Sequence, residues 1–106
     1  MALGLIETIG LSTAMVALDA ATKSADVTFV GYEKVIGVGK MISITLGLSG
    51  EVAAVKAAVE AGRVAGSRVG TVVSALVIPR AHEDVDIVIK RFVKAFLPEK
   101  DEKPQA

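Results

Sequence analysis

The stretch Phe29–Lys40 (FVGYEKVIGVGK) spaces glycines among apolar residues and ends in a lysine. Glycine-rich loops that end in lysine can bind phosphate through backbone N–H groups and the ammonium. A Walker-type loop needs G-x-x-x-x-G-K-[ST], but Lys34 stands at the first glycine position and Met41 at the hydroxyl position. The stretch also leads into a predicted strand, not into the helix that would hold the anion. Two interpretations remain: a connection between strands, or a loop that meets its copies at a symmetry axis.

His82 is the second candidate for chemistry, because it is the single histidine and is followed by Glu83 and Asp84. A histidine beside carboxylates can act as a general acid or base. No serine or cysteine nucleophile signature accompanies it, so we favour a polar residue at a helix N-terminus. The chain has no cysteine, which excludes thiolate chemistry and, with one histidine, a histidine-rich metal site from one chain. We predict no enzyme activity, no metal and no cofactor.

The composition predicts surface that is hidden in an assembly. Of 106 residues, 52% are hydrophobic and only 4% are aromatic. One small domain cannot bury so much aliphatic surface, so we expect it to pack against copies of itself or a partner. Twelve basic residues balance twelve acidic ones, which argues against a nucleic-acid partner. The N-terminus lacks a basic signal-peptide region and no apolar run reaches membrane-spanning length, so we predict no membrane association and a cytoplasmic location.

Hydrophobic periodicity predicts an α+β chain with the ferredoxin-like split βαβ order, βαββαβ, and its helices on one sheet face. We expect strands over residues 2–9, 27–33, 41–46 and 71–78, the second buried and the last central in the sheet. Helices are expected up to Ser24 and over residues 50–68, with Ser12 and Ser49 as their N-caps. The second helix is expected to fray near Gly66.

Small residues recur at four-residue spacing along the second helix, at Ala54, Ala58, Gly62 and Gly66. Such residues let two backbones approach closely. We therefore expect tight helix packing along this stripe, either within the fold or between subunits.

The chain after Pro79 predicts an added amphipathic helix that ends before Pro98. Its apolar residues follow the i, i+3, i+4 pattern: Val85, Val88, Ile89, Phe92, Val93 and Phe96. The domain is thus expected to span residues 1–97, with a charged, disordered tail over 98–106. The sheet face opposite the two other helices needs cover, which this helix or a neighbouring subunit could supply. We favour such packing over binding to a membrane surface.

Several stretches resemble one family. The start ALGLIETIG, the segment GYEK, the helix GEVAAVKAAVEAG and the turn VIPRAH occur in the order seen in bacterial microcompartment shell proteins. The likeness covers residues 2–86. It is greatest to single-domain, hexamer-forming members, the major shell proteins of propanediol-utilisation, ethanolamine-utilisation and carboxysome compartments. The resemblance implies the same βαββαβ fold, homohexamers that tile edge to edge with other shell proteins, and a structural role without catalysis.

The resemblance also implies roles for particular residues at the hexamer edge. Lys23 matches an edge lysine, and Arg80 matches the arginine that reaches the neighbouring hexamer. Asp26 stands where the family often has asparagine. His82 matches the histidine after the motif, here behind Ala81 in place of proline.

By the same resemblance, the loop over residues 36–40 lines a central pore for small metabolites. Its residues are Ile36, Gly37, Val38, Gly39 and Lys40. The loop is two residues longer than the family's IGSG, so either Val38 or Lys40 faces the axis: an apolar ring, or a positive ring that favours anions. The apolar face of the last helix is a possible receptor for cargo peptides. The alternative function is a small ferredoxin-like ligand-binding or regulatory protein.

Overall fold

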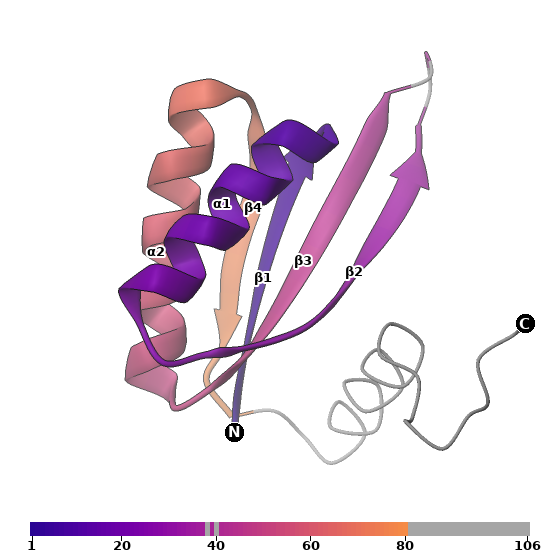
Figure 1. Cartoon of the computed structure of the whole chain (residues 1–106). Helices are drawn as coiled ribbons and strands as arrows, with labels where there is room; N and C mark the ends of the chain where they lie inside the picture. The colour runs from indigo at the N-terminus through magenta and orange to yellow at the C-terminus, as the bar shows by residue number, and fades with distance from the viewer. Residues whose placement is uncertain (38, 40, 81–106) are drawn as a thin grey trace, which may run out of the picture.

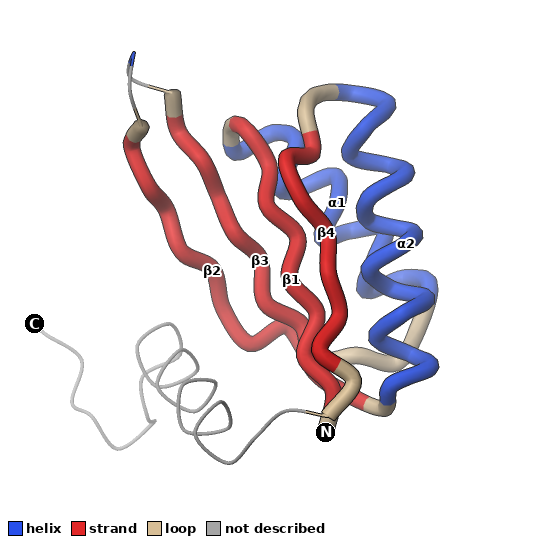
Figure 2. Tube along the Cα trace, turned by 180° about the vertical axis from the view of Figure 1, so that it is seen from behind, coloured by secondary structure: helices blue, strands red, loops and turns tan. Residues whose placement is uncertain are grey.

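The computed structural model describes residues 1–37, 39 and 41–80, and all structural statements below concern these residues. Six elements follow in the order β1 (Ala2–Ile9), α1 (Leu11–Ser24), β2 (Thr28–Ile36), β3 (Ile42–Gly50), α2 (Val52–Val69) and β4 (Val72–Ile78). The sheet is antiparallel with strand order β2-β3-β1-β4. Both helices cover one face of it (Figures 1 and 2). The predicted ferredoxin-like fold is thus confirmed, while the predicted last helix and tail lie outside the described residues.

The core lies between the two central strands and the helices. Alternate residues of β1 and β3 point toward α1 and α2, and Ile6 and Leu48 are completely buried there. Their neighbours in the core cluster are small or branched: Ala2, Ala14, Ala17, Ala21, Ile44, Leu46, Val55, Ala58 and Val59. Ile44 and Leu46 of the strand predicted over residues 41–46 are thus core residues. Burial of this aliphatic surface is the main force that holds the helices on the sheet.

Glycines in α2 bring its backbone against α1 and β1. A Cβ added at Gly62 would lie 2.7 Å from Cδ1 of Ile6 and 2.9 Å from the carbonyl oxygen of Ala17. A Cβ at Gly66 would lie 3.4 Å from Cβ of Ala17 and 2.9 Å from Cγ2 of Val72. The small-residue stripe therefore serves packing within the fold, the first of the two predicted possibilities.

The predicted helix boundaries need correction. The residue before α1 is Gly10, with φ +86°, and the helix begins at Leu11, so Ser12 lies inside the first turn and is not the cap. Ser49 belongs to β3, where it is buried and pairs with Leu3 and Thr28. Neither helix has a side-chain hydrogen bond at its N-cap. Helix α2 also continues past Gly66 to Val69, because the packing against Ala17 and Val72 holds its last turns.

The positions of two strands also differ from expectation. Within the described residues, the apolar strand β4 pairs with β1 alone, so it is an edge strand and not a central one. The strand predicted as buried over residues 27–33 is the opposite edge, β2, and most of its side chains are exposed. Apolar content misled both predictions, because composition alone does not distinguish an apolar edge strand from a buried central strand.

The sheet face away from α1 and α2 divides into an apolar part and a polar part. Leu3 and Val30 form a small cluster with Leu5 and Ile78 near the N-terminal end of β1. Farther along β1, the Ser43 hydroxyl donates a hydrogen bond to Oε2 of Glu7 at 2.6 Å. The Ser74 hydroxyl approaches Oε1 at 3.4 Å. Glu7 thus joins the three strands β3, β1 and β4 on this face.

We expect the substitution Gly62→Ala to lower the stability of the protein. Alanine adds up to about 1 kcal/mol of helix propensity, but its methyl group overlaps a backbone oxygen that cannot move alone, which costs about 1–3 kcal/mol. Thermal unfolding at fixed protein concentration measures the effect. The exposed helix position Ser67→Ala is the control, and its midpoint should stay the same or rise. A Gly62→Ala midpoint at or above the native one would contradict close helix contact.

The Glu7 cluster gives a second expectation. Ser43→Ala removes a short hydrogen bond to a carboxylate and should lower the free energy of unfolding by about 1–2 kcal/mol. Ser74→Ala should cost less, because its longer contact is exposed. Urea unfolding of both variants at one protein concentration makes the comparison. Equal losses of unfolding free energy, or a larger loss for Ser74→Ala, would show that the 2.6 Å hydrogen bond is not the main stabilising contact of the cluster.

Candidate assembly surfaces

The two groups of residues singled out by resemblance lie at opposite ends of the sheet. At one end, Ile36 pairs with Ile42 beside the β2–β3 turn. At the other end, one residue of each strand lies in a row of paired residues across the sheet: Thr28 of β2, Ser49 of β3, Leu3 of β1 and Ile78 of β4. Asp26 comes just before that end of β2, and Arg80 just after that end of β4. Since a strand rises about 3.3 Å per residue, the two ends are roughly 25 Å apart.

The first surface is the hairpin end, which we define as Val35, Ile36, Met41 and Ile42. The Gly37 N–H donates to the Met41 carbonyl at 2.7 Å and closes the turn. Gly39 has φ +75°, a conformation that glycine adopts without strain. The glycine-rich stretch therefore connects two strands. Of the predicted pore residues, Ile36, Gly37 and Gly39 are exposed here, and Val38 and Lys40 lie outside the described residues.

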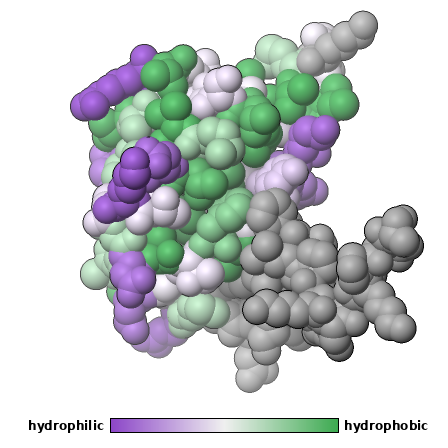
Figure 3. Space-filling model, in the orientation of Figure 1, coloured by the Kyte–Doolittle hydropathy of each residue, from purple (hydrophilic) through white to green (hydrophobic). Residues whose placement is uncertain are grey.

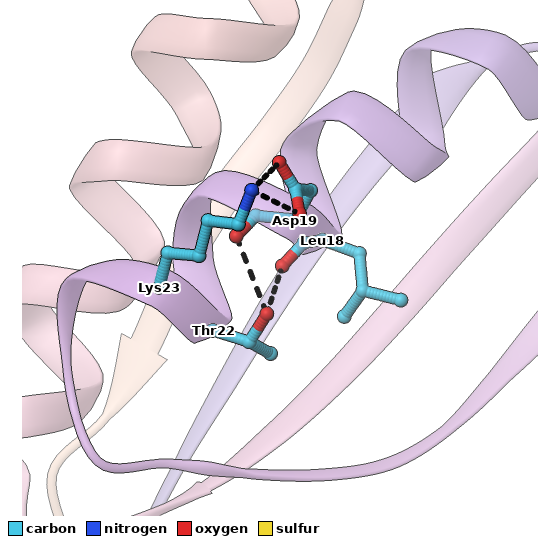
Figure 4. Close-up of polar contacts among 4 residues, drawn as sticks. All are labelled: Leu18, Asp19, Thr22 and Lys23. Atoms are coloured by element: carbon cyan, nitrogen blue, oxygen red, sulfur yellow. Dashed lines mark hydrogen bonds and ion pairs between the residues drawn. The ribbon is translucent and has the colours of Figure 1, made fainter.

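The second surface is the edge end, defined by Lys23, Asp26 and Arg80. Lys23 lies in the last turn of α1, where its Nζ is 3.0 Å from Oδ1 of Asp19 (Figure 4). Both side chains are largely exposed, so this pair contributes little to stability and leaves Lys23 available to another partner. In the same turn the Thr22 hydroxyl donates back to the Leu18 carbonyl at 2.8 Å.

Asp26 and the end of β4 share a surface hollow of about 530 Å³. Its lining also includes Met1, Ser49, Glu51 and Pro79. Among the described residues, Arg80 forms no salt bridge, and its side chain is exposed. The structure thus places Lys23, Asp26 and Arg80 at one end of the molecule. The fourth predicted edge residue, His82, lies outside the described residues.

Between the two ends, both flanks of the molecule expose apolar side chains. One flank has a groove of about 290 Å³ between α1 and strands β2 and β3. Apolar side chains, green in Figure 3, gather on this side of the molecule. It is lined by Leu11, Ala14, Met15, Leu18, Phe29, Tyr32, Ile44 and Leu46. The other flank exposes Val69, Val73 and Leu76 at the end of α2 and along β4. The composition predicted an excess of apolar surface. It identified no individual flank residue, because the hydrophobic pattern does not distinguish a flank residue from a core residue.

In the described part of the chain, no group of three or more His, Asp or Glu side chains could hold a metal ion. A hydrogen bond from Arg63 lowers the pKa of Glu60, and the same contact raises the pKa of Arg63. Both lie exposed on α2, so they form a surface pair and not a site. None of the described helices is long and apolar enough to cross a membrane.

Comparison with known proteins extends these observations. The BMC domain family model matches residues 2–81. Bacterial microcompartment shell protein PduA of Citrobacter freundii is 49% identical over 90 residues, which cover 85% of this chain and 92% of the relative. Shell protein EutM of Salmonella typhimurium is 47% identical over 82% of this chain and 86% of its own length. Carboxysome shell protein CcmK2 of Synechococcus elongatus is 43% identical over 84% of this chain and 85% of its own length.

A solved structure agrees with these relatives. The crystal structure of a microcompartments protein from Desulfitobacterium hafniense DCB superposes with a TM-score of 0.68 and 36% identity over 81% of this chain. This chain spans about half of that protein, 47% of its length. The family model, the relatives and the shared fold agree, and the chain belongs to the BMC domain family of bacterial microcompartment shell proteins.

Proposed function

We propose that this chain is a structural, non-enzymatic subunit of a bacterial microcompartment shell, and that it acts as a closed homohexameric ring. In the ring, the hairpin ends surround a central passage for small metabolites. The edge ends contact neighbouring rings, of this chain or of other shell proteins, and so tile a facet. The relatives named as shell proteins support the general role.

One observation carries the finer proposal: pore candidates and edge candidates lie at opposite ends of one sheet, with apolar flanks between them. A ring subunit needs this arrangement, with one end toward the axis, one end toward the perimeter and a flank for each neighbour. The two flanks differ, since one is a groove and the other an exposed strand and helix end. Contacts between unlike surfaces are heterologous and close into a ring when the rotation between subunits allows it.

Burial of both flanks also accounts for the apolar surplus. Leu11, Met15 and Tyr32 on one flank and Val73 and Leu76 on the other are between 45% and 61% exposed in the single chain. Each apolar Å² removed from water contributes about 25 cal/mol. Rings therefore gain stability that the isolated domain lacks.

The edge end supplies polar groups for contacts between rings. Arg80 can donate two parallel hydrogen bonds to carbonyl or carboxylate oxygens of a neighbour, and Lys23 adds a second cation. Asp26 lies at the same end and offers an acceptor. Such contacts are weak singly, and many of them act together when rings tile.

We expect Arg80→Ala and Lys23→Ala to abolish sheets or tubes while leaving the rings intact. The reason is that these residues lie at the edge end, away from the apolar flanks. Light scattering on a sizing column measures the ring, and negative-stain imaging shows the sheets. Arg63→Ala, which removes an exposed arginine in the middle of α2, should keep both. If Arg80→Ala and Lys23→Ala assemble like the native protein, the edge assignment fails.

The same light scattering tests the function itself. The native protein should elute with the mass of six chains. A monomer or trimer that binds a nucleotide saturably would instead support the small regulatory protein considered from the sequence.

A further inference from the structure

We propose that the surface hollow at the edge end binds a calcium ion through the side chains of Asp26, Ser49 and Glu51, which all line it. The site belongs to a single chain. Its consequence for assembly rests on the proposed function, because the hollow lies at the end of the molecule where two rings meet. A bound cation offsets the negative charge that each ring brings to this contact.

Three segments that are far apart in sequence bring oxygen atoms to the hollow. Asp26 precedes β2, Ser49 lies in β3, and Glu51 is the N-cap residue of α2. A Cβ added at Gly50 would lie 3.3 Å from the carbonyl oxygen of Asp26. Asp26 therefore packs against the residue that separates Ser49 from Glu51. Thr28, which pairs with Ser49, adds a second hydroxyl to the lining.

The Ser49 hydroxyl is the observation that points to a ligand. Ser49 is only 5% exposed, and among the described residues its hydroxyl has no hydrogen-bond partner. Its side chain lies on the same sheet face as that of Thr28, because the two residues are directly paired. A buried polar group without a partner costs free energy, so such groups are rare in folded proteins. An ion in the hollow supplies the missing partner.

The two carboxylates are available to a cation. Asp26 and Glu51 are exposed, and neither forms a salt bridge within the part of the chain that the structure describes. The remaining lining residues are apolar or glycine: Met1, Ala2, Gly50, Val52 and Pro79. In its described lining, the hollow thus presents carboxylate and hydroxyl oxygens without a lysine or arginine side chain to neutralise them.

Oxygen ligands of this kind favour a hard divalent cation over the softer metals that prefer nitrogen or sulfur. Calcium accepts about six to eight oxygens in flexible geometry, whereas magnesium demands a near-ideal octahedron. A hollow of about 530 Å³ with exposed carboxylates suits calcium. The described residues hold no group of three or more acidic side chains that could hold a metal ion. Water therefore completes the ligand shell, and we expect weak binding, with a Kd of about 0.1–1 mM.

Equilibrium dialysis against radioactive CaCl2 tests the site. The native protein should bind calcium saturably, at about one ion per chain. Asp26→Asn and Glu51→Gln should each weaken binding about tenfold or more, because each removes a charged ligand. Glu60→Gln removes an exposed carboxylate of α2 and should bind calcium like the native protein. Native affinity in either Asp26→Asn or Glu51→Gln overturns the site.

Ser49→Ala distinguishes a ligand from a structural residue. In EGTA, the midpoint of its thermal unfolding should stay the same or rise, because the variant removes an unpartnered buried hydroxyl. Its affinity for calcium should fall about threefold or more, since one ligand is lost. A lower midpoint together with unchanged affinity shows that Ser49 serves the fold alone, and this result overturns its role in the site.

Negative-stain imaging of the native protein in saturating CaCl2 and in EGTA measures the consequence for assembly. Sheets should form at about threefold lower protein concentration with calcium, because the bound ion reduces repulsion between the edge ends of two rings. Asp26→Asn should respond less than the native protein. Sheets of the native protein that do not respond to calcium overturn the place of the ion between rings.

Light scattering distinguishes a failure of this inference from a failure of the proposed function. Rings of six chains without saturable calcium binding overturn the site and leave the proposed function standing. A native protein that binds calcium but forms no ring supports the site and overturns the proposed ring.

Discussion

The close contact between α1 and α2 is the constraint on which the rest of this structure depends. Gly62 and Gly66 leave no room for a side chain against Ala17, Ile6 and Val72. The two helices therefore share one face of the sheet without large side chains between them. Aromatic residues are not needed in such a core, which agrees with their 4% share of the chain. The fold that results is thin, and much of its apolar surface remains on the flanks.

That geometry links packing to assembly. In the part of the chain that the structure describes, β2 and β4 are the two edge strands of the sheet, and α1 and α2 lie on one of its faces. Exposed strand edges and apolar flanks are hazards for a monomer, because they invite uncontrolled association. In a closed ring, the two neighbouring subunits would bury these strand edges and flanks. Burial of the strand edges and apolar flanks that the single chain exposes would thus drive the proposed assembly.

The polar groups are placed where the apolar ones are not. Glu7 with Ser43 and Ser74 lies on the sheet face away from α1 and α2, where it adds polar character without a buried unpaired charge. Lys23, Asp26 and Arg80 gather at the edge end, and the hairpin end is apolar in its described residues. In the proposed assembly, weak polar contacts at the edge end would join rings, and apolar burial would hold the subunits of one ring together.

The sequence by itself determined the order of the six elements, the α+β class, the close packing along Ala58, Gly62 and Gly66, and the family motifs. These features depend on local periodicity and on residue size, which can be read along the chain. Only the tertiary structure decided that β4 and β2 are edge strands, that Ser49 is a buried strand residue and that the hairpin outreaches β1. Strand order and register arise from contacts between residues far apart in sequence, and an apolar strand has the same composition whether its cover is its own core or a neighbouring subunit.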